Sequence, residues 1–466
     1  MKRLLFKSMY NWSKSWTAVF LFQIQLGRLK LERLFARKSS HRSRFRVMAT
    51  ACWEFPIYSQ TFVYQELLNL IQNRFDVRFL YFHLNSFSQL PSQFVPLWRS
   101  RRRVFLHPEV CKRALAYYKK RKPERVEKIT GLLCRESGMS SKDLQNHRHF
   151  MQAFSFTRAV EAYLPDYLHS YFFYEGTLFT MIASYLLDIP RGVSGYTDHM
   201  LKDYELKLVP LHLKHSSLII ATSERIKQEL MDIEPQVDPN HIIVKPNAIN
   251  TGQYPIVSRQ GIESQQPYRL ICVSRIEPKK GLHYLVEAVR ILRNRGFEVM
   301  LHLLGGVDNK RSNREYAREL DQRIKDLKLV RTVHLEGRRT ESEIKHFLAT
   351  SHMFVAPFVE TESGDKDGIP TSLLEAMSTG LPVITTDAGS ILEVIDDGQD
   401  GVIVPQRDSN ALATSIADLI NNKEQRELLG RNASKKVHTK FDVSMCEHLF
   451  HNRLRQILKS RPNAVS

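Results

Sequence analysis

Short apolar runs alternate with amphipathic segments along most of this chain. The apolar runs predict buried strands, and segments with apolar residues every three or four positions predict helices. In the first half we expect strands over residues 46–52, 77–82, 167–170, 192–197, 217–224 and 242–247. In the second half we expect strands over residues 268–274, 299–304, 332–335, 353–357 and 383–385, with helices over 282–295, 314–327 and 341–350. This alternation is typical of α/β folds with parallel, doubly wound sheets.

A polar linker at residues 251–266 divides the pattern into two halves. The sequence therefore predicts two Rossmann-like domains, residues 46–250 and residues 251–440. We expect the C-terminal helix within residues 441–466 to cross back to the first domain. Residues 84–155 are polar, basic and helical in pattern, and we expect them to be an insertion or the acceptor face of the first domain.

Residues 1–45 form a basic N-terminal extension in this scheme. Residues 1–46 hold twelve lysines and arginines and one acidic residue, Glu32, so +11 of the chain's +19 net charge lies there. The apolar run from Trp16 to Leu26 is interrupted by two glutamines and is too short to span a membrane. A solvated or disordered extension and an amphipathic segment on an anionic membrane both remain open. No recognised nucleic-acid motif accompanies the charge, and we expect no nucleic-acid partner.

The cysteines and glycines narrow the class of protein further. Five scattered cysteines without CxxC spacing favour a reducing compartment and no disulfide or metal framework. No GxGxxG follows a strand, which argues against a dinucleotide oxidoreductase. We therefore expect a cytoplasmic protein without a metal or cofactor, at most peripheral to the inner face of a membrane.

The most informative stretch is GDKDGIPTSLLEAMSTGLPV, residues 364–383. It predicts a glycine-bearing turn followed at once by a helix, with Pro370 at the helix start and Thr371 or Ser372 as a capping residue. The exposed N–H groups and positive dipole end of such a helix suit a phosphate. Asp367 and Glu375 are about two helical turns apart, so both can face the same ligand.

This stretch resembles the donor-binding signature of the retaining family-4 glycosyltransferases, in which two acidic residues are separated by seven positions. It is most similar to the subgroup that builds bacterial exopolysaccharides such as colanic acid. Asp367 stands where the family usually has glutamate, which keeps the charge but retracts it by about one methylene. The resemblance extends over roughly residues 46–445 and implies a GT-B fold, in which two Rossmann-like domains face each other across a cleft.

The resemblance also implies which residues bind a nucleotide-sugar donor. Arg275 and Lys280 match the family's phosphate-binding arginine and lysine, and Glu375 matches the residue that holds the ribose hydroxyls. Asp367 would contact the donor sugar and stabilise the transition state. His199 would approach the sugar from the first domain as a second catalytic residue. The remaining donor-binding positions are Gly337, Arg338, Gly368, Ile369, Pro370 and Thr371.

From these residues we expect a retaining hexosyltransferase that uses a UDP- or GDP-sugar and acts on a lipid-linked or polysaccharide acceptor. One alternative is a nucleotide-sugar epimerase or hydrolase of the same fold. The other is a catalytically inactive partner subunit, because Asp367, Gln60 and the missing glycine after Asn247 depart from the family pattern. The sequence leaves the base, the sugar and the acceptor open.

Overall fold

The computed structural model describes residues 2–38, 45–50, 54–56, 61–84, 94–195, 206–259 and 267–460. Its described strands form two larger sheets and one small pair, β2 (Glu54–Phe55) with β4 (His83–Leu84). The first sheet has the order β5 (Arg101–Arg103), β3 (Asp76–Tyr81), β1 (Arg46–Thr50), β6 (Tyr167–Tyr171), β7 (Arg191–Gly195), β8 (Leu218–Ala221), β9 (Ile242–Val244). The second has the order β12 (Val333–Gly337), β11 (Val299–Leu304), β10 (Tyr268–Val273), β13 (Met353–Ala356), β14 (Val383–Thr386), β15 (Val402–Val404).

Neighbouring strands in both larger sheets pair in parallel, as in the register of Val47 with Val77 in the first sheet and Leu270 with Leu301 in the second. Parallel sheets need helical crossovers that cover both faces. Around the first sheet these are α2 (Thr61–Gln72), α3 (Leu97–Ser100), α4 (Pro108–Arg121), α5 (Pro123–Ser137), α6 (Ser141–Asn146), α7 (Arg148–Tyr163), α8 (Glu175–Leu187), α9 (Val209–Lys214) and α10 (Glu224–Ile233). Around the second they are α11 (Leu282–Asn294), α12 (Arg311–Asp326), α13 (Glu341–Thr350), α14 (Thr371–Ser378), α15 (Ser409–Asn421) and the first part of α16 (Lys423–Lys440). The α/β fold class is as predicted.

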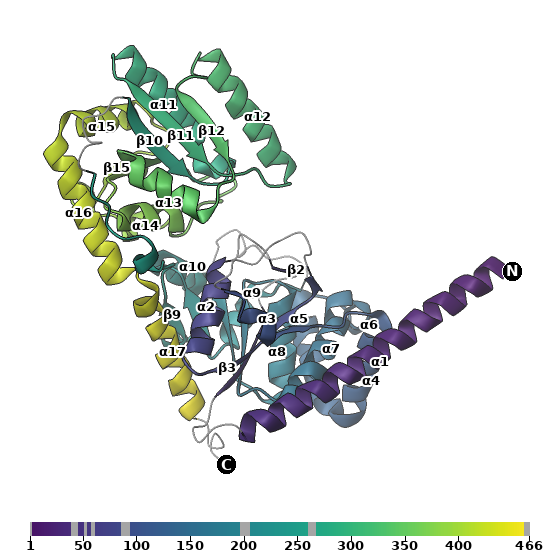
Figure 1. The fold of residues 1–466 in the computed structure, drawn as a ribbon. Helices are drawn as coiled ribbons and strands as arrows, with labels where there is room; N and C mark the ends of the chain where they lie inside the picture. The colour runs from purple at the N-terminus through teal and green to yellow at the C-terminus, as the bar shows by residue number, and fades with distance from the viewer. Residues whose placement is uncertain are drawn as a thin grey trace.

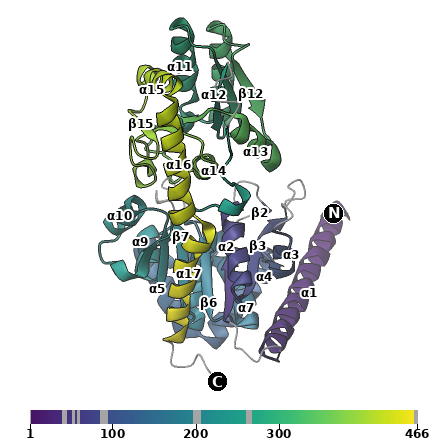
Figure 2. The ribbon, with the colours of Figure 1, turned by 60° about the vertical axis from the view of Figure 1, so that its left-hand side comes forward.

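The two sheets lie in two stacked units, and α16 and α17 (Val443–Lys459) run along one side of both (Figures 1 and 2). Phe450, Leu454 and Leu458 of α17 belong to the apolar core of the first sheet. The two chain crossings between the units lie side by side, since the Ile249 N–H donates to the Phe441 carbonyl at 3.0 Å and the Val443 N–H to the Ile249 carbonyl at 2.9 Å. The C-terminal helix therefore ties the last part of the chain to the first sheet.

The N-terminal segment forms one helix, α1 (Lys2–Lys38), which packs against α4 and α7 on the first unit (Figure 1). Val19, Phe22, Leu26 and Leu29 recur every three or four positions and are buried in the core of that unit. Among the described residues, no helix combines the length and the apolar composition needed to cross a bilayer. The buried residues are separated by polar positions, so a search for continuous apolar runs does not detect this stripe.

Glu32, the acidic residue of this segment, fixes α1 to the edge of the first sheet. Its carboxylate lies 2.9 Å from Arg78 Nε on β3 and 2.5 Å from Arg102 NH2 on β5. Burial alone would raise the pKa of Glu32, but its hydrogen bonds to Arg102 and Arg78 lower it below the usual value. The strand Arg101–Arg103 was not expected from the sequence, because three consecutive arginines give no apolar signal.

Candidate active site

The signature stretch lies where the second unit faces the first (Figure 1). β13 and β14 flank it in the chain, and α14 begins at Thr371 directly after the turn. Pro370 takes the position before the helix rather than its first turn, and no side chain caps this helix start. The prediction that Thr371 or Ser372 caps the helix is therefore wrong. A helix start without a side-chain cap leaves backbone N–H groups available to an anion.

A dense cluster of charges surrounds the turn before α14. Lys280 Nζ donates to Asp367 Oδ2 at 2.6 Å, and both side chains are largely buried. Lys279 Nζ donates to Asp365 Oδ1 at 3.1 Å and lies 3.6 Å from Asp367 Oδ1. The loop after β10 thus presents two lysines to the carboxylate that the sequence singled out.

The lysines control the ionisation of Asp367. Burial would raise the pKa of this carboxyl, but the charges of Lys280 and then Lys279 hold it below its usual value. Burial likewise acts to lower the pKa of Lys279, while Asp367 and Asp365 raise it above normal. Both shifts favour the charged forms of Asp367 and Lys279 at neutral pH, beside the α14 start.

Arg275 extends the cluster toward solvent. Its NH2 lies 3.0 Å from Glu277 Oε1, and its side chain is about half exposed at 49%. Glu277 is buried and also lies 3.8 Å from Lys280 Nζ. A planar guanidinium and two ammonium groups on one loop form a site that suits the oxygens of a diphosphate.

Glu375 occupies a different environment on α14. A hydrogen bond to Tyr254 and the nearby charges of Glu341 and Lys345 on α13 surround its carboxyl. Burial dominates these effects and raises the pKa of Glu375 from 4.5 to about 7. A carboxyl with a pKa near 7 is a marker of functional sites, although structural networks also produce such shifts.

The ends of neighbouring strands bring the other predicted positions to the same edge of the second sheet. Gly337 ends β12, and its carbonyl accepts the Gly305 N–H at 2.8 Å. Arg338 follows and packs beside Gly306, where an added Cβ would lie 3.6 Å from Arg338 Nε. The Ile276 N–H donates to the Gly306 carbonyl at 3.1 Å. The structure thus gathers the loops after β10, β11 and β12.

Several residues of the first unit reach the signature, and two of them contact its turn and helix start although the sequence analysis did not select them. Asn247 Nδ2, just after β9, donates to the Ile369 carbonyl at 2.8 Å. Thr222, just after β8, is buried, and its Oγ1 lies 3.7 Å from the position a Cβ would take on Gly368. Both follow strands of the first sheet, so their position beside the donor segment depends on how the two units meet. His199 and the loop from Trp53 to Gln60 lie largely or wholly outside the described residues.

A carboxylate from the second unit also contacts the start of a helix in the first. Glu393 accepts the backbone N–H groups of Glu224 and Arg225 at 2.7 and 3.0 Å. Ser390 Oγ donates to Ser223 Oγ at 2.9 Å. These contacts hold α10 against the segment that follows β14. The two units are therefore joined on the same side as the charge cluster.

Gly389 determines where the turn containing Asp367 lies. It has φ +61°, and a Cβ there would lie 1.9 Å from the Asp367 carbonyl oxygen. Gly398 has a similar φ of +71° but has open space at the same position. We expect Gly398→Ala to lower the free energy of unfolding by about 1 kcal/mol, through left-handed strain alone. We expect Gly389→Ala to lower it by about 3 kcal/mol, because overpacking adds to the strain.

Urea denaturation of the two variants measures this difference directly. Equal losses in Gly389→Ala and Gly398→Ala would contradict the close packing of Gly389 on Asp367.

The comparisons with known proteins assign the second half of the chain to a family. Residues 256–436 match the family described as Glycosyl transferases group 1. This part of the chain is therefore a domain of that family.

Curated relatives match part of this chain. The chain is 32% identical over 216 residues to the amylovoran biosynthesis glycosyltransferase AmsK of Erwinia amylovora, covering 44% of this chain and 50% of the relative. It is 28% identical over 169 residues to the capsular polysaccharide biosynthesis glycosyltransferase CapM of Staphylococcus aureus, covering 36% and 41%. The matches with these two relatives thus span half or less of each relative's length. They confirm the predicted resemblance to bacterial exopolysaccharide glycosyltransferases.

Solved structures share the fold of nearly the whole chain. The Anabaena protein Alr3699/HepE, in complex with UDP and glucose, superposes with a TM-score of 0.64 at 17% identity and covers 89% of this chain and 100% of its own. Sucrose-phosphate synthase from Thermosynechococcus elongatus superposes with a TM-score of 0.67 at 15% identity and covers 90% and 100%. The predicted GT-B fold is thereby confirmed.

Proposed function

We propose that this protein is a retaining glycosyltransferase of cell-surface polysaccharide synthesis. It moves a hexose from a UDP- or GDP-sugar to a lipid-linked or polysaccharide acceptor. The bond between the anomeric carbon and the phosphate oxygen breaks, and a new bond forms to an acceptor hydroxyl oxygen. The nucleoside diphosphate leaves with the bonding electron pair, and its phosphate takes the proton of the hydroxyl.

The observation that carries this proposal is the pair Lys280–Asp367 beside the start of α14, with Lys279 next to it. A departing diphosphate develops negative charge, and preorganised cations and backbone N–H groups stabilise such charge most in a partly dry site. Lys280, Lys279 and Arg275 would bind the phosphates together with the helix start.

The other site residues would bind the remaining parts of the nucleotide sugar, which are the ribose, the donor sugar and the base. Glu375 would bind the ribose hydroxyls, because a carboxylate can accept two hydrogen bonds. Asp367, held ionised by the lysines, would bind hydroxyls of the donor sugar and favour positive charge at its anomeric carbon. Gly337 and Arg338 would contact the base. Backbone groups of residues 368–371 would line the sugar and phosphates, and His199 remains a prediction for the first unit.

A donor-turnover assay separates this proposal from its alternatives. Purified protein is incubated with a panel of UDP- and GDP-sugars, with and without bacterial lipid extract, and released nucleoside diphosphate is measured. Release that depends on the extract, with sugar incorporated into lipid, is the expected result. Release or isomerisation without extract would favour an epimerase or hydrolase, and binding without turnover would favour an inactive partner subunit.

The raised pKa of Glu375 predicts how donor binding depends on pH. The pKa of this carboxyl is about 7 in the folded protein against 4.5 for the free group. It therefore favours the folded state below pH 4.5, and this contribution is lost as the pH rises through 7. Ribose binding requires the ionised form, so the affinity for UDP-glucose should increase about tenfold between about pH 6 and about pH 8.

Calorimetric titration with UDP-glucose at several pH values measures this dependence. Glu375→Gln should bind weakly with an affinity independent of pH, whereas the surface variant Glu315→Gln should retain the increase. A pH-independent affinity in the unmodified protein would contradict the role of Glu375.

The exposed face of α1 supports a membrane location for the acceptor. Opposite the buried stripe, the large apolar side chains of Phe20, Ile24, Leu31 and Leu34 are 52% exposed or more. Positions 20, 24, 31 and 34 share one side of a helix. The sequence around this exposed stripe is strongly basic. An apolar stripe bordered by cations suits the interface of an anionic bilayer, and we place the enzyme at the cytoplasmic face of such a membrane.

Flotation with phosphatidylglycerol vesicles tests this location. The double variant Ile24→Ser/Leu31→Ser should lose most of the vesicle binding, because two exposed apolar side chains no longer enter the bilayer. Leu449→Ser removes a comparably exposed leucine (52%) from α17 and should bind like the unmodified protein. Equal binding by all three proteins would refute the role of α1.

A further inference from the structure

A groove on the first unit lies at the amino ends of the strands of the first sheet. The carboxyl ends of these strands face the second unit and its charge cluster. It is formed by α5, α8 and the start of β7, and its volume is about 440 Å³. Residues that line it include Arg125, Lys128, Leu132, Tyr185, Arg191 and His215. Arg191 is the first residue of β7, whereas the contacts to the second unit follow the last residues of the strands. The groove is therefore separate from the proposed donor site.

Arg191 is the unusual member of this groove. Its side chain is almost completely buried, and residue exposure is 1%. NH2 donates to the His212 carbonyl at 3.0 Å and lies 3.4 Å from Nδ1 of the same residue. NH1 has no hydrogen-bond partner among the described residues, and no described carboxylate forms an ion pair with Arg191. A buried charge without a counter-charge is costly, and native proteins rarely retain one without a function.

The positive potential of Arg191 extends into the groove. Burial lowers the pKa of this guanidinium to about 9, so it is still charged at neutral pH. Burial and then the Arg191 charge lower the pKa of His215, which is exposed at the rim. An anion in the groove would thus meet the charge of Arg191, which has no ion-pair partner among the described residues.

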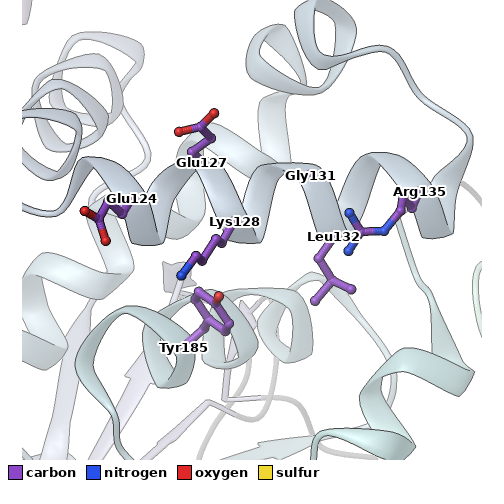
Figure 3. A pocket seen from close by; sticks show the side chains of 7 residues that line it. All are labelled: Glu124, Glu127, Lys128, Gly131, Leu132, Arg135 and Tyr185. Carbon is purple, nitrogen blue, oxygen red and sulfur yellow. The ribbon is translucent and has the colours of Figure 1, made fainter.

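The rim adds further cations from α5. Arg125 NH1 donates to the Tyr185 carbonyl at 3.1 Å, at the end of α8. Lys128 is exposed, and Figure 3 shows its side chain extending toward Tyr185, at the boundary with an adjoining hollow that Leu132 also lines. Glu127 of the same helix points away from Tyr185 (Figure 3). Asp188 also lines the groove, so the charge facing it is positive but not uniformly so.

We propose that this groove binds a phosphate group, either of a free phosphate compound or of a lipid headgroup, with Arg191 as its buried counter-charge and Lys128 at its rim. Phosphate fits better than a single carboxylate, because it can carry two negative charges and has oxygens for several donors. The apolar wall made by Leu132 and Met181 leaves room for an attached organic group. The site is independent of the nucleotide-sugar donor site.

Thermal unfolding with inorganic phosphate tests the proposal. The measurements use the Lys280→Ala protein, in which the donor site is already weakened, and compare phosphate with chloride at equal ionic strength. Phosphate should raise the Tm in a saturable manner. Adding Arg191→Met should weaken phosphate binding by about tenfold or more, because a charge-assisted hydrogen bond is lost. Without phosphate, Arg191→Met should unfold at an equal or higher temperature, since an uncompensated buried charge has been removed.

Two further variants complete the test. Lys128→Met alters only an exposed rim residue and should also weaken the response to phosphate. Arg135→Met, on the same helix but lining only the adjoining hollow, should retain it. A response that is absent, or that is unchanged in both Lys128→Met and Arg191→Met, would overturn the proposal. Because every protein in the series carries Lys280→Ala, this result does not depend on the proposed transferase activity.

Vesicle flotation then distinguishes the two sources of phosphate. Phosphatidylcholine vesicles that contain phosphatidate are mixed with the Lys280→Ala protein and with Lys280→Ala/Lys128→Met. Weaker flotation of the second protein assigns the phosphate to a lipid headgroup. Equal flotation of the two, together with the thermal response, assigns it to a free phosphate compound.

Discussion

Replacing Lys280 by alanine is expected to reduce sugar transfer by about 100- to 1,000-fold, the usual effect of removing one group that stabilises transition-state charge. Lys280 Nζ lies 2.6 Å from Asp367 Oδ2 next to the α14 start, so its loss removes a cation from the phosphates and the ion-pair partner of the proposed sugar-binding carboxylate. Lys279 also lies 3.6 Å from Asp367. The remaining lysine should therefore keep Asp367 ionised and the fold intact.

Steady-state rates with the preferred nucleotide sugar measure this effect. Lys325→Ala is a matched control, because Lys325 also forms an ion pair, with Asp321 at 2.6 Å, but on the exposed face of α12. The control should transfer sugar at the unmodified rate. A Lys280→Ala protein with full activity would show that the departing diphosphate is bound elsewhere.

Replacing Lys245 by methionine is expected to lower the free energy of unfolding of the first unit by about 3–5 kcal/mol, because it leaves two buried carboxylates without their cation. Lys245 Nζ lies 2.8 Å from Glu66 Oε2 on α2 and 2.8 Å from Glu447 Oε1 on α17. All three side chains are nearly inaccessible to solvent. The lysine thus connects the C-terminal helix to the core of the first sheet.

The pKa values in this cluster give the pH dependence of the variant. In the native protein, burial would raise the pKa of Glu66, but the Lys245 charge lowers it. Burial raises the pKa of Glu447 to about 7 despite the same lysine. Without Lys245 both carboxyls must be neutral in the folded state, so both folded pKa values lie above the unfolded ones. The variant should therefore be most stable at acidic pH and lose stability as the pH rises toward neutrality.

Tryptophan fluorescence during urea denaturation observes this unit selectively, because all four tryptophans lie within the first 98 residues. Lys214→Met removes an exposed lysine that donates to Gln236 and should leave stability within about 0.5 kcal/mol. Equal midpoints for the two variants at neutral pH would contradict the importance of the buried cluster.

Much of the fold could be predicted from the sequence because parallel strands in buried sheets are continuous apolar runs. The helix at Glu341–Thr350 has the predicted bounds, and most strands differ by only a few residues. Prediction failed where the apolar signal was weak or interrupted. Arg101–Arg103 forms an edge strand because it pairs with β3. Its central residue, Arg102, forms an ion pair with Glu32 of α1, which is distant in sequence.

The candidate site also contains residues that could be predicted from the sequence and residues that could not. Lys280, Asp367 and Glu375 could be selected from the sequence, because they match the donor-binding pattern of the family that the chain resembles. The carboxyl ends of successive parallel strands then bring their loops to one edge. Thr222 and Asn247 were missed, because their proximity to Gly368 and Ile369 depends on how two separately folded units meet. Arg191 was also missed, since a single arginine at a strand start gives no indication that its charge is buried and unpaired.

The central claim is that the second unit binds a nucleotide sugar through Lys280 and Glu375, and thermal unfolding with a panel of UDP- and GDP-sugars tests it most directly. A ligand that binds only the folded state raises the Tm according to its occupancy. We expect one class of nucleotide sugar to raise the Tm of the unmodified protein, with the increase lost in Lys280→Ala and in Glu375→Ala. No increase with any nucleotide sugar, or the same increase in both variants, would contradict the account.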